Sequence, residues 1–212
     1  MHAEDILDQE TTAELENFSY PLEFEFKITT LSNDFFARDA QGRTLAYVRQ
    51  KMFKFKEAVM VYSNDDKQKL IYKIDADRII DFNANYQFTD HNEEVVGRIG
   101  RKGMRSIWKA NYQIFNKQSE QDYFIQEENP WAKVGDALLG EIPILNFFTG
   151  YLANPRYAVK TMDGRQVARL SKTPSFFGRR FKLEQLEDFS KEHGERILLS
   201  LMMMVLLERK RG

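Results

Sequence analysis

The stretch that decides the fold is ILLSLMMMVLL, residues 197–207, eleven residues of which only Ser200 is not apolar. At about 100° per residue it is apolar on every side of a helix, so such a helix must be buried all round. Its length would be roughly 16 Å, far short of the roughly 30 Å core of a bilayer. We therefore expect it to fill the inside of a surrounding structure. The alternatives are a tail anchor and an exposed dimerisation helix.

Three similar segments indicate what surrounds the helix: residues 35–62, 86–115 and 157–186. Each has an aromatic-rich strand, a turn containing Asp, a strand in which small or apolar residues alternate with Arg, a basic turn and a further strand. Alternation of this kind, bounded by Asp and Gly turns, is typical of β-hairpins. The turn residues that we take as equivalent are Asp39, Asp90 and Asp163.

Further alternating stretches at 22–28, 69–75 and 122–127 bring the expected number of strands to twelve. Strands joined in sequence by short turns favour antiparallel pairing, and a large sheet removes its exposed edges by closing. A barrel of more than about eight strands has room for more than its own side chains. The sequence thus predicts a mainly β fold: an antiparallel closed barrel of about twelve strands around a central, buried, C-terminal hydrophobic helix.

The predicted domain organisation is simple. Residues 1–19 form an acidic N-terminal segment, and residues 20–212 form one barrel domain. Within that domain we expect a short helical insertion at 129–154 and the central helix at 192–208.

Composition excludes several classes of protein. The 212 residues include no Cys, which rules out disulfides, thiolate metal sites and cysteine nucleophiles. The acidic start of the chain lacks the pattern of a signal peptide, and no apolar run is long enough to span a bilayer. We expect a cytoplasmic protein, with peripheral attachment to a membrane as the further option.

The phrases VRQKMFKFKEAVMVY (48–62), YKIDADRIIDF (72–82), GRIGRKGMRSIW (97–108) and LMMMVLLERKRG (201–212), with YQFTD ahead of the third, resemble the LURP-one-related family. This family belongs to the tubby C-terminal-like superfamily, whose distant members include tubby proteins and phospholipid scramblases. The resemblance covers about residues 22–212 and implies a twelve-stranded barrel around a central helix. Tubby proteins bind phosphoinositides and scramblases act on membranes, so lipid contact is a further implication. The LURP-one-related branch implies no particular activity, and no binding residue of tubby proteins aligns with this chain.

Residues 128–155 are rich in apolar side chains and begin with a helix-start signal, Asn129 followed by Pro130. One interpretation is a cap over a barrel mouth or a contact with the acidic N-terminal segment. A second is a helix at a membrane interface, and a third is a homodimer surface. The interfacial candidates are Trp131, Phe147 and Phe148.

No pattern typical of catalysis is present. The three histidines, His2, His91 and His193, are scattered, and GRIGRKG (97–103) lacks the spacing of a phosphate-binding loop, so we interpret it as a tight basic turn. Asp75, Asp77 and Asp81 lack the Gly of a calcium loop and are expected on an exposed strand face. We predict no catalytic residues, no metal and no cofactor. The alternative is a soluble enzyme or a carrier of a small ligand that uses a pocket at a barrel mouth.

Basic turns supply the candidate binding site. If each repeat has four strands, these turns return to one end of the barrel and bring cations together with aromatic side chains. Such a rim suits an anionic phospholipid headgroup, while nucleic acid is less compatible. Pairing of these cations with Asp and Glu is the alternative, and an unidentified protein partner and any oligomeric state remain open. The candidate residues are Lys51, Lys54, Arg101, Lys102, Arg105, Lys172, Arg179 and Arg180.

Overall fold

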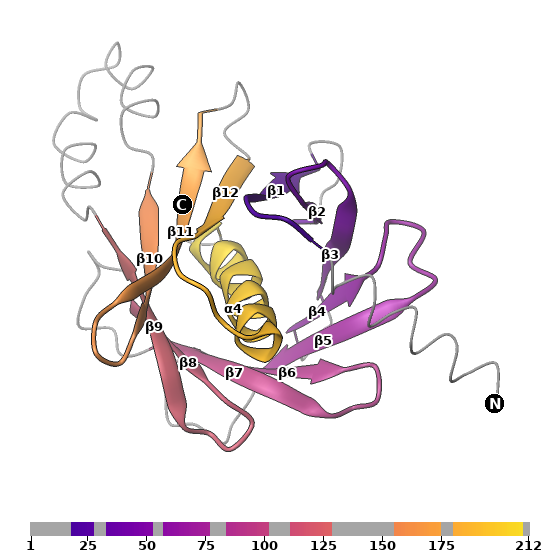
Figure 1. Ribbon diagram of the computed structural model, residues 1–212. Helices are drawn as coiled ribbons and strands as arrows, with labels where there is room; N and C mark the ends of the chain where they lie inside the picture. Colours follow the sequence, from indigo (N-terminus) through magenta and orange to yellow (C-terminus); the bar gives the residue numbers. More distant parts are fainter. Residues whose placement is uncertain are drawn as a thin grey trace, which may run out of the picture.

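A computed structural model describes residues 18–27, 33–52, 57–76, 84–101, 111–128, 155–174 and 180–209. These residues form a twelve-stranded barrel with a long helix running through it (Figure 1). The helix is α4 (Lys191–Arg209). The strands are β1 (Leu22–Phe26), β2 (Phe35–Arg38), β3 (Thr44–Met52), β4 (Glu57–Tyr62), β5 (Leu70–Ala76), β6 (Ala84–Asp90), β7 (Val95–Arg101), β8 (Asn111–Phe115), β9 (Gln121–Glu127), β10 (Arg156–Thr161), β11 (Gln166–Thr173) and β12 (Arg180–Gln185).

Every strand pairs antiparallel with its neighbours in sequence, and β12 pairs with β1 to close the barrel. In this closing ladder Leu22 lies opposite Leu183, and Glu25 lies opposite Arg180. Closure pairs each of the twelve described strands on both sides, so none of them is an edge strand. The predicted fold class is confirmed.

Because the strands alternate in direction, the connections fall into two sets. We call one end of the barrel the turn end, where the connections are residues 39–43, 63–69, 91–94, 116–120, 162–165 and 186–190. We call the other the loop end, where the connections are residues 27–34, 53–56, 77–83, 102–110, 128–155 and 174–179. The helix α4 begins at the turn end, directly after β12, and finishes at the loop end.

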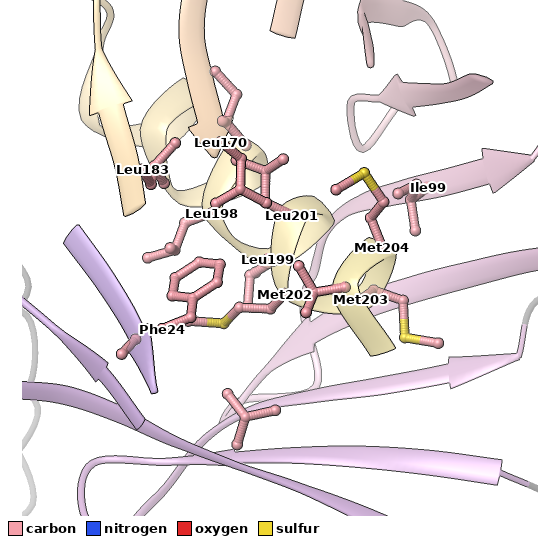
Figure 2. Packing of buried hydrophobic residues seen from close by; sticks show 14 of the residues in the cluster. Phe24, Ile99, Leu170, Leu183, Leu198, Leu199, Leu201, Met202, Met203 and Met204 are labelled. Carbon is pink, nitrogen blue, oxygen red and sulfur yellow. The ribbon is translucent and has the colours of Figure 1, made fainter. Parts of the chain in front are cut away.

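The helix is buried in the barrel as its sequence predicted. From Ile197 to Leu206, no side chain is more than 7% exposed. Figure 2 shows these side chains packed against residues of the barrel wall, among them Phe24, Ile99 and Leu170. Full burial of a Leu or Met side chain contributes about 1.5–3 kcal/mol before the loss of conformational entropy. Within the part of the chain that the structure describes, no helix combines the length and the hydrophobicity needed to cross a bilayer.

Four of the turns at the turn end share one geometry. The residue that opens each turn bonds through its backbone N–H to the carbonyl oxygen four positions later, and the residue before that carbonyl has a positive φ. In each case the strand register shifts just before the turn, as in a hairpin with a bulge. The opening residues are Asp39, Asp90, Asn116 and Thr161.

The equivalence expected from sequence is therefore right for Asp39 and Asp90 and wrong for Asp163. Thr161 occupies the equivalent position in the third repeat, and Asp163 lies two residues later, where it bonds to the Thr161 hydroxyl. The Asp39 and Asp90 carboxylates accept backbone N–H groups within their turns, whereas the Thr161 hydroxyl donates to the backbone oxygen of Arg165 at 3.2 Å. The backbone geometry of the residue that opens the turn is therefore the same in all three repeats, although the residue type differs.

Several predictions lie outside the described residues. These are the acidic segment up to residue 17, the helical insertion at 129–154 with Trp131, Phe147 and Phe148, and the acidic residues Asp77 and Asp81. Asp75, on β5, forms an ion pair with Lys73 at 2.6 Å.

Candidate functional site

Strand direction decides where the candidate basic residues lie. Lys51 is near the end of β3, Arg101 ends β7, Lys172 is near the end of β11, and Arg180 begins β12. All four of these backbone positions are at the loop end, because β3, β7 and β11 run toward it and β12 runs away from it. Lys54, Lys102, Arg105 and Arg179 lie outside the described residues.

Arg101 and Lys172 lie on the inward faces of their strands. The Arg101 guanidinium is 5.5 Å from the centre of the Tyr112 ring, and the Tyr112 hydroxyl donates to Glu208 of α4 at 2.6 Å. Lys172 is two residues from the fully buried Leu170, so it shares that face of β11. Both cations therefore belong to the mouth of the barrel at the loop end.

Arg180, in contrast, is committed to the barrel wall. Its Nη2 donates to Glu25 Oε1 at 2.7 Å, and Arg38 pairs with the other oxygen of the same carboxylate. Partial burial opposes ionisation of Glu25, but hydrogen bonds and charge from Arg180 and Arg38 outweigh it and lower the pKa of this carboxyl. The pairing of rim cations with acids, which the sequence left open, is thus realised for Arg180.

The structure explains why the GRIGRKG sequence begins with a glycine. Gly97 to Arg101 belong to β7 and not to a turn, which corrects the interpretation from sequence. A Cβ at Gly97 would lie 2.5 Å from Cδ of Arg196 and 2.7 Å from the backbone oxygen of Phe115. Glycine is required here because the Arg196 side chain of α4 passes directly over the strand.

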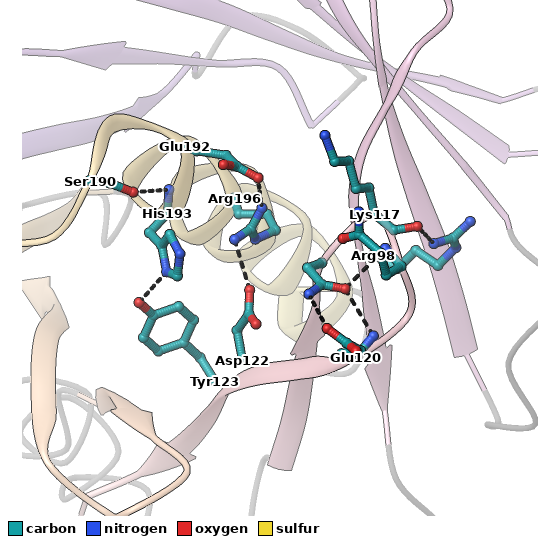
Figure 3. A network of polar contacts seen from close by, with 11 residues as sticks. Arg98, Lys117, Glu120, Asp122, Tyr123, Ser190, Glu192, His193 and Arg196 are labelled. Carbon is teal, nitrogen blue, oxygen red and sulfur yellow. Dashed lines mark hydrogen bonds and ion pairs between the residues drawn. The ribbon is translucent and has the colours of Figure 1, made fainter.

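Arg196 is the largest fully buried side chain described, at 1% exposure. It pairs with Asp122 at 2.7 Å and with Glu192 at 2.9 Å, as Figure 3 shows. One turn away, His193 Nδ1 lies 2.6 Å from the Tyr123 hydroxyl. A buried guanidinium needs such partners, so this network fixes the start of α4 against β9.

A cavity of about 190 Å³ lies at the turn end, beside the start of α4. Its wall comes from the residues before β1, from β3, β4 and β5, from the end of β12, and from α4 and the segment that leads into it. Most of the lining is aliphatic or aromatic, and Glu195 contributes the one carboxyl group among the lining residues. The aromatic residues that line it are Phe18, Tyr20, Tyr72 and Phe189.

Glu195, near the start of α4, is half-buried against this cavity. Burial raises the pKa of its carboxyl, and a hydrogen bond with Tyr72 and the charge of Lys191 only partly oppose that rise. Burial also raises the pKa of the Tyr72 phenol, and the neighbouring Glu195 adds to the rise. The sequence signal for this site was weak: one acid three residues after Glu192, at the edge of the apolar run.

Among the described residues, no group of three or more His, Asp or Glu side chains is placed to hold a metal ion. The described residues thus place inward cations at the mouth of the loop end and an apolar cavity with one acid at the turn end. Binding at the loop end stays a prediction from the sequence, and the sequence did not predict the residues of the cavity.

Comparison with known proteins defines the class. The model of the LURP-one-related family matches residues 44–183, which include strands β3 to β11 and most of β12. The chain belongs to the LURP-one-related family. Neither the search of curated proteins nor the search of solved structures found a match.

Proposed function

We propose that this protein is a non-catalytic binding module that attaches to anionic phospholipid headgroups through the loop end of its barrel and acts there with protein partners. The observation that supports this most is that Lys51, Arg101 and Lys172 all lie where their strands end at the loop end of the barrel. Cations gathered at one end of a molecule attract an anionic surface, while the same charges spread around a barrel would not.

The interior of the barrel favours binding over catalysis. The buried Arg196 is held by Asp122 and Glu192, and the His193 ring is bonded to Tyr123. These groups already have partners that fix α4, so we assign them a role in stability. Lipid contact would then depend on the loop end, with Arg101 and Lys172 as the described contributors.

Vesicle co-sedimentation tests the proposal with two charge-matched variants. Lys102→Glu with Lys172→Glu changes the loop end, and Lys69→Glu with Lys117→Glu makes the same change at the turn end. Each lysine near an anionic membrane contributes about 1 kcal/mol, so the loop-end variant should bind at least about tenfold more weakly. The turn-end variant should bind as the unmodified protein does.

The vesicles should contain phosphatidylserine in phosphatidylcholine, at low and at physiological salt, with pure phosphatidylcholine as the uncharged control. Binding should fall with added salt because screening weakens exposed charges. Equal binding by both variants, or no binding to anionic vesicles at low salt, would overturn the lipid proposal. Thermal unfolding of each variant should confirm that the barrel is intact.

A further inference from the structure

The cavity at the turn end is separate from the loop end, where lipid contact is proposed, and its chemistry suits a different ligand. We propose that it binds a small neutral molecule: an apolar body about the size of one six-membered ring that carries one oxygen able to accept a hydrogen bond. The proposal rests on the volume of the cavity, on lining charges and polar groups that already have partners, and on the hydroxyl of Tyr20.

The volume sets the size of the ligand. In another protein, a cavity of about 150 Å³ lined by Leu, Ile and Phe binds benzene. The cavity here measures about 190 Å³, which leaves room for one ring and a short branch. Leu45, Val61 and Leu198 are among the aliphatic side chains that line it, and none of these three is more than 7% exposed. Such a wall suits the apolar body of a ligand.

The aromatic part of the wall is held in place by its own packing. Phe18 and Tyr20 pack edge to face with ring centres 5.4 Å apart, and Tyr20 and Phe189 do so at 6.2 Å. Gly194 of α4 leaves room for this packing, because a Cβ there would lie 2.9 Å from the Phe189 ring. A ligand would therefore enter a largely formed site, and little binding free energy would be lost in ordering it.

The two charged side chains at the cavity, Glu195 and Lys191, act on each other. The Tyr72 hydroxyl donates a hydrogen bond to the Glu195 carboxylate, and the charge of Lys191 favours the same ionised form. Neither an added cation nor an added anion would therefore find an uncompensated opposite charge there. Either ion would still lose its hydration on entering an apolar site, which costs free energy. A neutral ligand avoids this cost.

Two further polar side chains at the cavity also have partners. Gln185 donates through Nε2 to the backbone oxygen of Glu187 at 3.1 Å. The Ser190 hydroxyl accepts the backbone N–H of His193 at 3.4 Å, as Figure 3 shows. Both bonds belong to the connection between β12 and α4, and a strongly polar ligand would have to compete with them.

The Tyr20 hydroxyl differs from these groups. It lies 4.0 Å from the position that a Cβ on Gly194 would occupy, which places it against the first turn of α4 beside the cavity. It makes no hydrogen bond to any residue in the described part of the chain, and burial raises the pKa of its phenol. The hydroxyl therefore keeps its proton and can donate it to an oxygen of the ligand, which would satisfy a partly buried polar group.

The test uses the full chain and four probes that each carry a short branch on one benzene ring: acetophenone, cumene, benzoate and benzamidine. Calorimetry or amide chemical shifts should show binding of the neutral acetophenone and cumene. The anion benzoate and the cation benzamidine should bind at least about tenfold more weakly, because each loses hydration without gaining a counter-charge. Acetophenone has the accepting oxygen that cumene lacks, so this pair separates the hydrogen bond from the apolar contacts.

Three variants locate the binding. Tyr20→Phe keeps the ring contacts and removes the hydroxyl, so acetophenone should bind about two- to tenfold more weakly, while cumene should bind as before. Tyr157→Phe removes a buried phenol hydroxyl at the start of β10, at the loop end, and should leave both affinities unchanged. Ala46→Leu extends a lining side chain into the cavity and should weaken acetophenone and cumene together.

Thermal unfolding of each variant checks that the barrel is intact, and the comparison of the four probes needs no variant. The proposal is overturned if neither neutral probe binds, or if an ion binds as tightly as acetophenone does. It is also overturned if Tyr20→Phe lowers the affinity for acetophenone no more than Tyr157→Phe does, or if Ala46→Leu leaves binding unchanged. None of these results bears on vesicle binding, which tests the opposite end of the barrel.

Discussion

Gly97 and Arg196 are structurally coupled: the space that the glycine leaves on β7 is filled by the side chain of the arginine on α4. The arginine directly precedes the apolar run of α4 and is buried with it, which is tolerated because Asp122 and Glu192 pair with it. The glycine breaks the alternation of β7 and leaves the space that the arginine occupies. A buried charge and a missing side chain are two unfavourable features that offset each other when α4 and β7 come together.

Gly97→Ala should therefore lower the free energy of unfolding by about 1–3 kcal/mol, as expected when a methyl group is forced into a filled space. Urea denaturation measures the loss. The control is the same substitution in an Arg196→Ala background, where the nearest obstructing atoms, Cδ and Cγ of Arg196, are gone. The cost should be smaller there, although the Phe115 carbonyl remains close. An equal cost in both backgrounds would contradict this account of Gly97.

At the scale of elements, the sequence indicates a turn most clearly where the turn needs a residue with a positive φ. The four related turns each place one residue at positive φ: Gly42, Glu93, Ser119 and Gly164. Two of these are glycines and mark their turns in the sequence, while Glu93 and Ser119 do not. In those two turns the signal is the opening Asp90 or Asn116, whose side chain accepts two backbone N–H groups.

The helix α4 is the element on which the barrel interior depends. Met203 on α4 is 1% exposed, and Met162, in the turn after β10, is 59% exposed. Met203→Asp places an unpaired charge in the core and should abolish cooperative unfolding or lower stability by several kcal/mol. Met162→Asp is the same chemical change on the surface and should alter stability by less than about 0.5 kcal/mol. Near-ultraviolet circular dichroism and urea denaturation would compare them, and similar unfolding of both variants would contradict the central role of α4.

At the scale of the whole molecule, the two ends of the barrel are separated by the length of α4, which is about 28 Å for 19 residues. Phe18 lines the turn-end cavity, so the preceding acidic segment joins the barrel at the end away from the proposed lipid contact. This distance exceeds the Debye length of about 10 Å at 0.1 M salt and is similar to the roughly 30 Å at 0.01 M.

Deleting residues 1–17 removes six acidic residues and no Lys or Arg. We expect the deletion to strengthen binding to anionic vesicles at about 0.01 M salt, because long-range repulsion falls, and to change it little at physiological salt. Co-sedimentation at the two salt concentrations measures the difference. A large gain at physiological salt would show instead that the segment reaches the loop end directly.

The sequence by itself determined the number of strands, their antiparallel order, the closed barrel and the buried helix. These follow from periodicity and from an all-apolar run, which are local properties that any satisfactory packing must respect. The sequence also predicted that the basic residues at strand ends lie at one end of the barrel, because every second connection between alternating strands returns to the same end.

Only the tertiary structure decided which side chains meet. The pairing of Arg180 with Glu25 spans 155 residues, and the bond between Tyr112 and Glu208 spans 96. The equivalence of Thr161 to Asp39, the space beside Gly97 and the cavity around Glu195 likewise arise where distant segments pack. Such contacts depend on register and on the exact position of α4 inside the barrel, and local patterns do not encode either of these.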